Sequence, residues 1–328
     1  PSLPAAVGES TESSLPFTNN YTVFKFDNVF QIRFQGDYRD LVISADDITV
    51  SGDPDAIKLE TRDDGINYYG ISALNINLGL GNDDINIQST HADTLTTVNA
   101  ATGNDRFFVT SDAASNLSDG PVAHGVMDGI QGNLVLEAGS GDNGLWVSDY
   151  DSLVADVNIQ ITNDSITGLS AGGITYKASD EGNFKEGIVI WTGTQDDSIN
   201  ISSVNVSDVT VTTLYSNTGN DVITVTAEDD LVNPAHNALS NEDARRLRIF
   251  SQQGTDEIDA QVATLALEIF GEGDADWIYG SSGDDVIAGG LGDNILYGGD
   301  GQDKIFADSG NDIIFGDNGQ ITIDGMDV

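Results

Sequence analysis

Gly271-Glu-Gly-Asp-Ala-Asp276-Trp-Ile278-Tyr opens a run of five consecutive nine-residue units. Two registers recur at this spacing: an oxygen-bearing side chain and, two residues later, a large aliphatic side chain. The oxygen register holds Asp276, Asp285, Asn294, Asp303 and Asp312, and the aliphatic register holds Ile278, Ile287, Leu296, Ile305 and Ile314, extended by Ile269 and Ile323. A three-residue strand with one inward aliphatic cannot bury it alone, so neighbouring units must stack into a solenoid.

The glycines and carboxylates of these units predict a metal site. Glycine allows the turn backbone to adopt positive φ and to bend tightly, which directs carbonyl oxygens inward. One carboxylate per turn completes a set of hard oxygen donors, which suits calcium better than zinc or copper. The preference of Asp and Asn for tight turns does not explain a nine-residue phase shared with a buried aliphatic.

The units resemble the RTX (repeats-in-toxin) nonapeptide, Gly-Gly-x-Gly-x-Asp-x-U-x, where U is a large aliphatic residue. The resemblance implies a right-handed parallel β-roll with calcium between turns and two units in each coil. It therefore pairs Asp276 with Asn294, Asn294 with Asp312, and Asp285 with Asp303. It also places glycine turns in the cages, at Gly283, Gly292, Gly301 and Gly310.

The match to the pattern is uneven. Asp274 replaces a glycine, and Asn294 replaces the usual acid. Ala307 and Asp308 replace the Gly-Gly of the last unit, and Ile321 stands at the next acidic position, where the series ends. Asp285 and Asp303 follow the pattern best.

The charge of the chain restricts its partners and its compartment. Its formal net charge is -42, from 54 acidic and 12 basic residues, which excludes nucleic acid and anionic membranes as natural partners and favours cations. It has no cysteine, so metal is the remaining cross-link. Calcium sites of extracellular modules bind at about 10⁻⁴ to 10⁻³ M. We therefore expect a module of a larger protein, secreted or at the cell surface, without membrane insertion.

The pattern divides the chain into four segments. Residues 1–20 are rich in Pro, Ser, Thr and Glu and predict a linker or tail. Residues 21–70 contain short alternating runs, typical of a β-rich cap or a small β domain. We expect an irregular parallel β-helix with insertions over 71–262, tapering into an RTX-type β-roll over 263–328. The predicted fold class is all-β.

Looser copies of the acidic turn occur upstream of the nonapeptides. Their turn residues are Asp83, Asp105, Asn143, Asp197, Asp221 and Asp256, and we interpret them as one series of larger coils. Solvated turns or ladders of backbone-bonded Asn and Asp side chains are the favoured reading, with calcium at Asp83, Asp105, Asp197 and Asp221 as the alternative. The gap after Asn143 predicts a coil without the motif near 157–166, and residues 233–248 predict a helical insertion.

The sequence gives little sign of catalysis. Gly168-Leu-Ser170-Ala-Gly172 has the G-x-S-x-G form of a hydrolase nucleophile elbow, but its flanks predict a turn between strands and not the required strand and helix. No His-Glu-x-x-His pair occurs. We expect no enzymatic activity, and favour a calcium-stabilised structural or adhesive module, with neighbouring copies or domains of the same assembly as candidate partners.

Two alternatives remain open. The first is a polysaccharide-active β-helix, a lyase or epimerase, with an RTX tail. Such enzymes bind acidic sugars with basic grooves, whereas the bases here are scattered: Lys25, Arg33, Lys58, Arg106, Lys177 and Lys185. The aromatic residues are expected to stack along the solenoid rather than to bind sugar; they are Trp146, Trp191, Trp277, Tyr279, Tyr297, Phe306 and Phe315. The second alternative is a calcium-dependent folding module for type 1 secretion.

Overall fold

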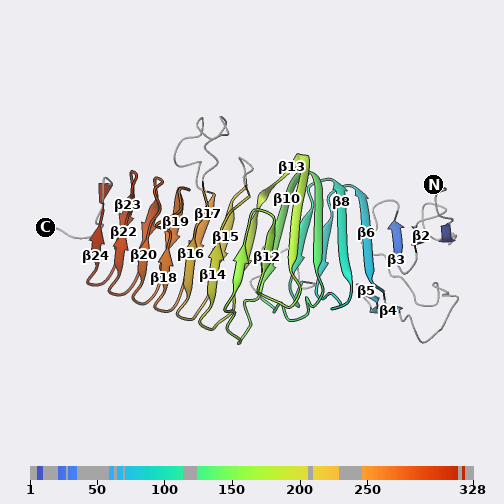
Figure 1. Ribbon diagram of the computed structural model, residues 1–328, viewed down its shortest axis with the longest axis horizontal. Coiled ribbons are helices and arrows are strands. Elements are labelled where there is room, and N and C mark those ends of the chain that lie inside the picture. Colours follow the sequence, from blue (N-terminus) through green and yellow to red (C-terminus); the bar gives the residue numbers. More distant parts are fainter. Residues whose placement is uncertain are drawn as a thin grey trace.

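The computed structural model forms a solenoid of parallel strands that follow one another along its long axis (Figure 1). It describes residues 71–113, 124–205, 210–228 and 246–316, together with the strand segments 6–9, 21–26, 29–34, 59–62, 65–68 and 320–321. Within these residues all regular structure is β-strand. The predicted all-β fold class is confirmed.

The strands stack in three columns, in which each strand pairs in parallel with its equivalent in the next coil. The first column contains β3 (Val29–Phe34), β6 (Ala73–Leu80), β8 (Leu95–Thr102) and the first parts of β10 (Leu134–Ser148) and β13 (Ile174–Trp191). The second column contains β7 (Asp84–Ile87), β9 (Arg106–Val109), the last parts of β10 and β13, β15 (Thr212–Tyr215), β17 (Leu247–Phe250), β19 (Leu267–Phe270), β21 (Val286–Ala288), β23 (Lys304–Phe306) and β25 (Gln320–Ile321).

The third column contains β11 (Ile159–Ile161), β14 (Ser198–Ile201), β16 (Val222–Val225), β18 (Glu257–Asp259), β20 (Trp277–Tyr279), β22 (Ile295–Tyr297) and β24 (Ile313–Phe315). Because the first column ends at β13, the later coils are built from short strands of the other two columns. This is the predicted taper from a β-helix into a β-roll. β11 also confirms that a coil crosses the long gap after Asn143.

A few strands lie outside the columns. β1 (Ala6–Glu9) and β2 (Tyr21–Phe26) extend β3 as antiparallel neighbours, β4 (Leu59–Arg62) pairs antiparallel with β5 (Gly65–Tyr68), and β12 (Ser165–Thr167) lies antiparallel between β11 and β13. β1 falls within residues 1–20, the segment for which a linker or tail is predicted. β2, β3, β4 and β5 lie within residues 21–70, for which a β-rich cap or small β domain is predicted.

The aliphatic register of the repeats forms the core of the roll. Ile278, Ile287 and Leu296 are fully buried, and Ile305 is 1% exposed. Each packs on its equivalent one coil away, because Ile278 pairs with Leu296 and Ile287 with Ile305. The 18-residue spacing of these pairs confirms that one coil consists of two nonapeptides.

Two predictions in the later coils need correction. Ile321, and not Ile323, pairs with Ile305, so the register shortens by two residues in the last coil. Ile323 itself lies outside the described residues. The predicted helix is wrong at its end, where Leu247 and Arg248 belong to β17, and residues 233–245 of it also lie outside the described residues.

Aromatic side chains stack between coils, as predicted for Trp146, Trp191, Tyr279, Tyr297 and Phe315. Trp191, Tyr215, Phe250 and Phe270 form one continuous stack, with ring centroids between 4.7 and 5.4 Å apart. Tyr279, Tyr297 and Phe315 form a second stack at 4.5 Å, and Phe108 stacks on Trp146. Rings stacked face to face present their edges outward, which leaves little flat surface for a sugar.

Candidate metal sites

Six turns of equal length connect the second column to the third. Each has six residues and ends in Asp or Asn immediately before the third-column strand. We call this side of the solenoid the aspartate edge; its turns are 192–197, 216–221, 251–256, 271–276, 289–294 and 307–312. The opposite side, the return edge, carries connections of variable length, and only its last coils contain nonapeptide turns. On the aspartate edge, six-residue turns of the length found in the nonapeptides therefore begin at residue 192, upstream of the nonapeptides themselves.

The acidic residues of the aspartate edge form one continuous ladder. In each step, a backbone N–H donates to Oδ1 of the equivalent residue in the next coil. The steps are Asp156 to Asp197 (2.7 Å), Asp197 to Asp221 (2.8 Å), Asp221 to Asp256 (2.8 Å), Asp256 to Asp276 (3.0 Å), Asp276 to Asn294 (2.9 Å) and Asn294 to Asp312 (2.9 Å). Both pairings predicted for Asn294 are confirmed. The looser turns at Asp197, Asp221 and Asp256 form a backbone-bonded ladder, and the same ladder continues through the nonapeptide turns.

Asp276 is left with an unsatisfied oxygen. Its side chain is fully buried, and its Oδ2 has no hydrogen-bond partner. Oδ2 of the upstream ladder residues Asp156, Asp197, Asp221 and Asp256 is buried without a partner in the same way. Burial raises the pKa of Asp276 to about 8, because a buried carboxylate loses its hydration. A buried, unpartnered carboxylate is unfavourable unless a cation neutralises it.

The turn glycine beside Asp276 leaves space for this carboxylate. A Cβ on Gly271 would lie 2.3 Å from Asp276 Oδ2 and 2.5 Å from Gly289 O in the next coil. Gly280 has the same surroundings, since its Cβ would lie 2.8 Å from Asp285 Oδ2 and 2.1 Å from Gly298 O. At Gly271 and Gly280, the carboxylate of the same turn and a carbonyl of the next coil thus converge, where any other residue would displace them.

The return edge carries a shorter ladder. The N–H of Leu267 donates to Asp285 Oδ1 at 2.7 Å, and the N–H of Asp285 donates to Asp303 Oδ1 at 3.0 Å, which confirms the third predicted pairing. Ser281 also donates to the Asp285 carboxylate, from its N–H at 2.7 Å and from its hydroxyl at 3.0 Å. Burial raises the pKa of Asp285 to about 7. Asp285 is therefore better satisfied by protein donors than Asp276.

The other predicted turn glycines bring the coils into close contact. A Cβ would lie 2.0 Å from Asp274 O at Gly292, 2.4 Å from Gly283 O at Gly301, and 1.6 Å from Gly292 O at Gly310. At Gly283 it would lie 2.7 Å from Ala266 N. Gly292, Gly301 and Gly310 also have positive φ. The role that the structure supports for these four glycines is close stacking of the turn backbones.

The looser turns near the N-terminus form a separate ladder, on the edge between the first and second columns. The N–H of Asp83 donates to Asp105 Oδ1, and that of Asp105 to Asn143 Oδ1, both at 2.9 Å. The single series expected from the sequence is therefore wrong, because Asp197 lies on the aspartate edge and does not continue from Asn143. Asp156 is the upstream member of its ladder, and sequence analysis missed it because a longer loop separates it from β11.

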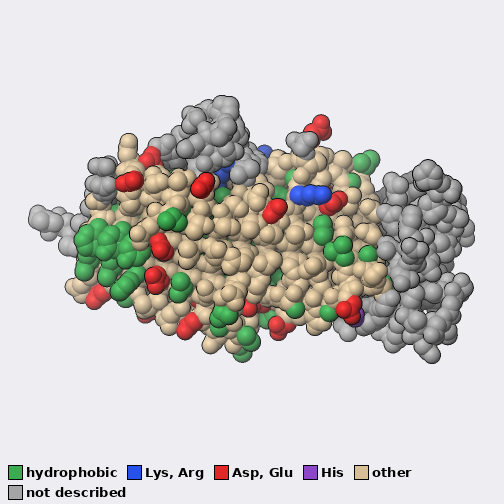
Figure 2. All heavy atoms as spheres, viewed as in Figure 1, with side chains coloured by type: hydrophobic (Ala, Val, Ile, Leu, Met, Phe, Trp, Pro, Cys, Tyr) green, Lys and Arg blue, Asp and Glu red, His purple; other side chains and the backbone are tan. Residues whose placement is uncertain are grey.

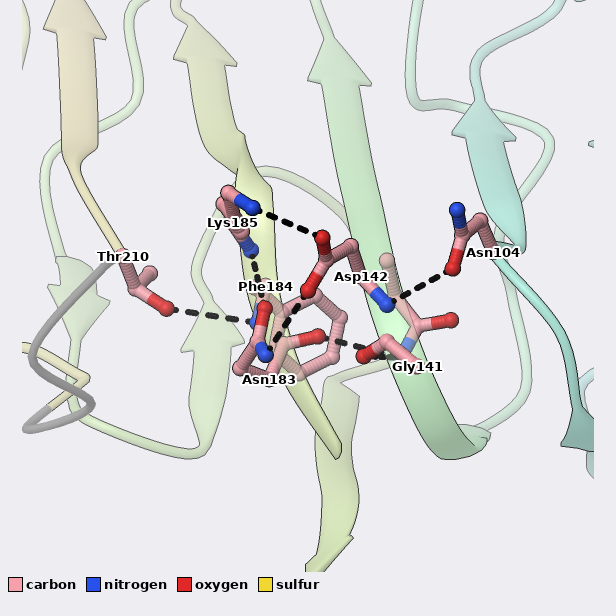
Figure 3. A network of polar contacts seen from close by, with 8 residues as sticks. Asn104, Gly141, Asp142, Asn183, Phe184, Lys185 and Thr210 are labelled. Carbon is pink, nitrogen blue, oxygen red and sulfur yellow. Dashed lines mark hydrogen bonds and ion pairs between the residues drawn. The ribbon is translucent and has the colours of Figure 1, made fainter. Parts of the chain in front are cut away.

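Beside this N-terminal ladder runs a network of amide and ionic contacts (Figure 3). The N–H of Asp142 donates to Asn104 Oδ1 at 2.9 Å, and Asp142 accepts from Asn183 Nδ2 at 3.1 Å and from Lys185 Nζ at 2.9 Å. The hydrogen bond from Lys185 holds the pKa of Asp142 below its usual range. Protein donors join these coils at Asp142, whereas Asp105 in the neighbouring ladder has a buried Oδ2 without a hydrogen-bond partner.

The donor set of the later coils fits calcium. Among the described residues no three His, Cys, Asp or Glu side chains converge on one point, so a cation there must take most of its ligands from backbone carbonyls. Calcium accepts mixed sets of six to eight carboxylate and carbonyl oxygens. The unsatisfied Asp276 Oδ2 and the adjacent Gly289 carbonyl are ligands of this kind, and Asp312 and Asp303 provide further carboxylates.

Comparison with known families agrees with this geometry. The model of the RTX calcium-binding nonapeptide repeat (4 copies) matches residues 268–296 and 288–320. Residues 268–320 are RTX calcium-binding repeats. No curated protein and no solved structure matches the chain. The RTX repeats extend from β19 to β25, whereas the ladder of the aspartate edge continues upstream of them. Among the described residues, no helix is long and apolar enough to span a membrane.

Proposed function

We propose that the protein is a non-enzymatic, extracellular solenoid module whose RTX coils are stabilised by calcium, and that it serves a structural or adhesive role in a larger secreted or surface-assembled protein. The observation that carries the proposal is the buried, unpartnered Oδ2 of Asp276 beside Gly289 O. Calcium would neutralise this carboxylate and bridge adjacent coils. The ligands we assign are Asp276 and Asp312 on the aspartate edge, Asp303 on the return edge, and carbonyl oxygens of the glycine turns.

The acidic composition supports a calcium-rich environment. Self-repulsion in a chain with a net charge of -42 destabilises a compact state, and each bound Ca²⁺ removes two negative charges from the balance. A ligand at about 100 times its dissociation constant stabilises the folded state by about 2.7 kcal/mol per site. Sites of about 10⁻⁴ to 10⁻³ M affinity need the calcium concentrations found outside cells.

The surface of the later coils supports an adhesive role. Trp277, Ile313 and Phe315 are each about half exposed on the outer face of β20 and β24. Figure 2 shows hydrophobic side chains gathered at this end of the solenoid, whereas acidic side chains are scattered over the rest of the visible face. A contiguous apolar face on a highly charged protein is typical of a contact surface.

The basic residues offer less support for a polysaccharide-active enzyme. Arg106 pairs with Asp84, Lys177 with Glu137, and Lys185 with Asp142, in each case across adjacent coils. In these ion pairs, the basic side chains neutralise acidic side chains of the solenoid itself. A surface hollow of about 340 Å³ is lined by Ala92, Asp93, Thr94, Leu95, Gln131, Gly132, Asn133 and Ala171, none of which would attract an acidic sugar.

Removal of calcium tests the proposal. Far-UV circular dichroism and thermal unfolding of the full chain should be recorded in excess EGTA, and again after calcium is restored, with magnesium as the control cation. We expect loss of β-structure and a lower Tm in EGTA, both reversed by calcium and not by magnesium. Identical spectra and Tm in EGTA and in calcium would refute calcium stabilisation.

A further inference from the structure

The first residue of each turn on the aspartate edge changes its chemistry along the solenoid. Upstream of the RTX repeats it carries a hydroxyl, at Thr192, Ser216 and Ser251; within the repeats it is Gly271, then Gly289, and Ala307 in the last turn. All three hydroxyl residues are fully buried. They occupy the position at which glycine later leaves space for a carboxylate and a carbonyl.

Each buried hydroxyl hydrogen-bonds to the next coil. Thr192 Oγ1 donates to Ser216 O at 3.0 Å, Ser216 Oγ to Ser251 O at 3.0 Å, and Ser251 Oγ to Gly271 O at 3.1 Å. In each case the acceptor is the carbonyl of the residue at the same turn position one coil later. The hydroxyls therefore form a second ladder, parallel to the ladder of aspartates.

The same hydroxyls face the aspartates of their own turns in looser contact. Burial raises the pKa of Asp221 to about 7 and that of Asp256 to about 6, and the hydroxyls of Ser216 and Ser251 act in the opposite direction. Asp276 has no hydroxyl beside it, and its pKa is raised further, to about 8. Oδ2 of Asp197, Asp221 and Asp256 has no hydrogen-bond partner, as at Asp276. The hydroxyl therefore occupies the carbonyl of the next coil and the space at the first turn position, and leaves the carboxylate in place.

A hydroxyl and a calcium ion are alternative partners for the carbonyl of the next coil. Calcium bonds to oxygen at about 2.3–2.6 Å, so two oxygens on opposite sides of the ion lie well over 4 Å apart. A hydroxyl oxygen at 3.0 Å from the carbonyl leaves no room for the ion between them. Glycine at the same position removes the hydroxyl and leaves the carbonyl and carboxylate of adjacent coils for a cation.

We infer that the buried hydroxyls of Thr192, Ser216 and Ser251 replace calcium in the upstream coils, so that calcium dependence on the aspartate edge begins at Gly271. The inference rests on the proposed calcium binding of the RTX coils. It assigns no calcium to the predicted ligands Asp197 and Asp221. The upstream coils would remain folded without metal and present β17 and β18 as a template for the RTX coils.

Hydrogen–deuterium exchange of the full chain, resolved by peptide, tests this boundary. In EGTA, we expect residues 268–316 to lose protection while residues 187–225 keep the protection they have in calcium. If both regions lose protection, the hydroxyls do not replace the metal, although calcium binding by the RTX coils stands. If neither region changes, calcium stabilisation itself is refuted, and the boundary with it.

A pair of variants at Ser216 separates the hydroxyl from the space it fills. Ser216→Gly should lower the Tm in EGTA, and calcium should restore it and add one bound Ca²⁺ per chain in a calorimetric titration. Ser216→Ala removes the hydroxyl but keeps the Cβ, so its Tm should fall by a similar amount in EGTA and in calcium. Equal calcium responses of the two variants would overturn the inference, and Ser251→Gly with Ser251→Ala repeats the comparison one coil later.

Discussion

The backbone N–H of Asp276 donates to Oδ1 of Asn294 at 2.9 Å, in the same way as every other step of the aspartate-edge ladder. An amide oxygen therefore replaces a carboxylate oxygen in the ladder without loss of the hydrogen bond. Asn294 is fully buried, as is Asp276. The carboxylate thus has two separable roles: one oxygen joins the coils, and the other, together with the charge, is available to a cation.

Asp276→Asn separates these roles. The variant keeps an Oδ1 acceptor for the N–H of Asp256 but removes a buried group that ionises unfavourably. We expect it to be more stable than the wild type in EGTA at neutral pH, by at least about 1 kcal/mol, and less responsive to calcium. Thermal unfolding of both proteins in EGTA and in calcium measures the two effects.

Asn294→Asp is the matched opposite change. It adds a carboxylate to a ladder position that already accepts the N–H of Asp276, so it should lower the Tm in EGTA and increase the stabilisation by calcium. A calcium response unchanged in both variants would show that the ladder carboxylates do not bind the ion.

The stability of the calcium-free protein should depend on pH through the upstream ladder as well. Burial raises the pKa of Asp221 to about 7, above its value of about 3.9 in an unfolded chain. The folded state therefore holds this proton more tightly, and its contribution to stability is complete below about pH 4 and lost as the pH rises through 7. In EGTA, the Tm should fall between pH 5 and 8.

Asp221→Asn is the control for this pH dependence. It keeps the acceptor for the N–H of Asp197 and removes the titrating group, so its Tm should fall less steeply over the same range. The expected difference is at most about 1.4 kcal/mol for each unit by which the pKa is raised. Parallel Tm profiles for the variant and the wild type would contradict a raised pKa at Asp221.

The repeat predicts much of the roll because its two registers fix the geometry. A strict nine-residue phase predicts the buried series from Ile278 to Ile305. The pairings of Asp276, Asn294 and Asp312 follow from the resemblance to the RTX nonapeptide, which implies two units in each coil. The prediction fails where the phase breaks. Ile321 replaces Ile323 opposite Ile305 because the last return turn is shorter.

Upstream, the sequence does not show on which edge a turn lies. Asn143 and Asp197 have similar flanking residues, but β10 continues from the first column into the second, whereas Asp197 precedes a strand of the third. The roles of Thr192, Ser216 and Ser251 were also missed. Each of these residues stands five positions before a ladder aspartate, which is a regular spacing in the sequence. The role of its hydroxyl, however, depends on the backbone carbonyl of the next coil, which the spacing does not reveal.

Gly271→Ala should damage both the fold and the calcium response. The added Cβ would lie 2.3 Å from Asp276 Oδ2 and 2.5 Å from the backbone oxygen of Gly289, so either the carboxylate or the next coil must move. We expect a loss of about 1–3 kcal/mol, the usual range for overpacking, and weaker calcium binding by calorimetry. Gly173→Ala is the control, because the nearest atom to its Cβ is the side-chain methyl of Thr167 at 3.0 Å. An equal loss of stability and of calcium binding in the two variants would argue against a cation site at Gly271.

Tyr297 lies at the centre of an aromatic stack on the outer face of the RTX coils. Its ring centroid is 4.5 Å from those of Tyr279 and Phe315, with interplanar angles of 13° and 9°. Each aromatic pair contributes about 0.5–1.5 kcal/mol beyond area burial, so Tyr297→Ala should destabilise the calcium-loaded protein by roughly 1–3 kcal/mol. Trp277→Ala removes a half-exposed ring from the same face and should cost less. Urea unfolding in calcium compares them, and a larger loss for Trp277→Ala would mean that burial against another surface, and not stacking between coils, stabilises this face.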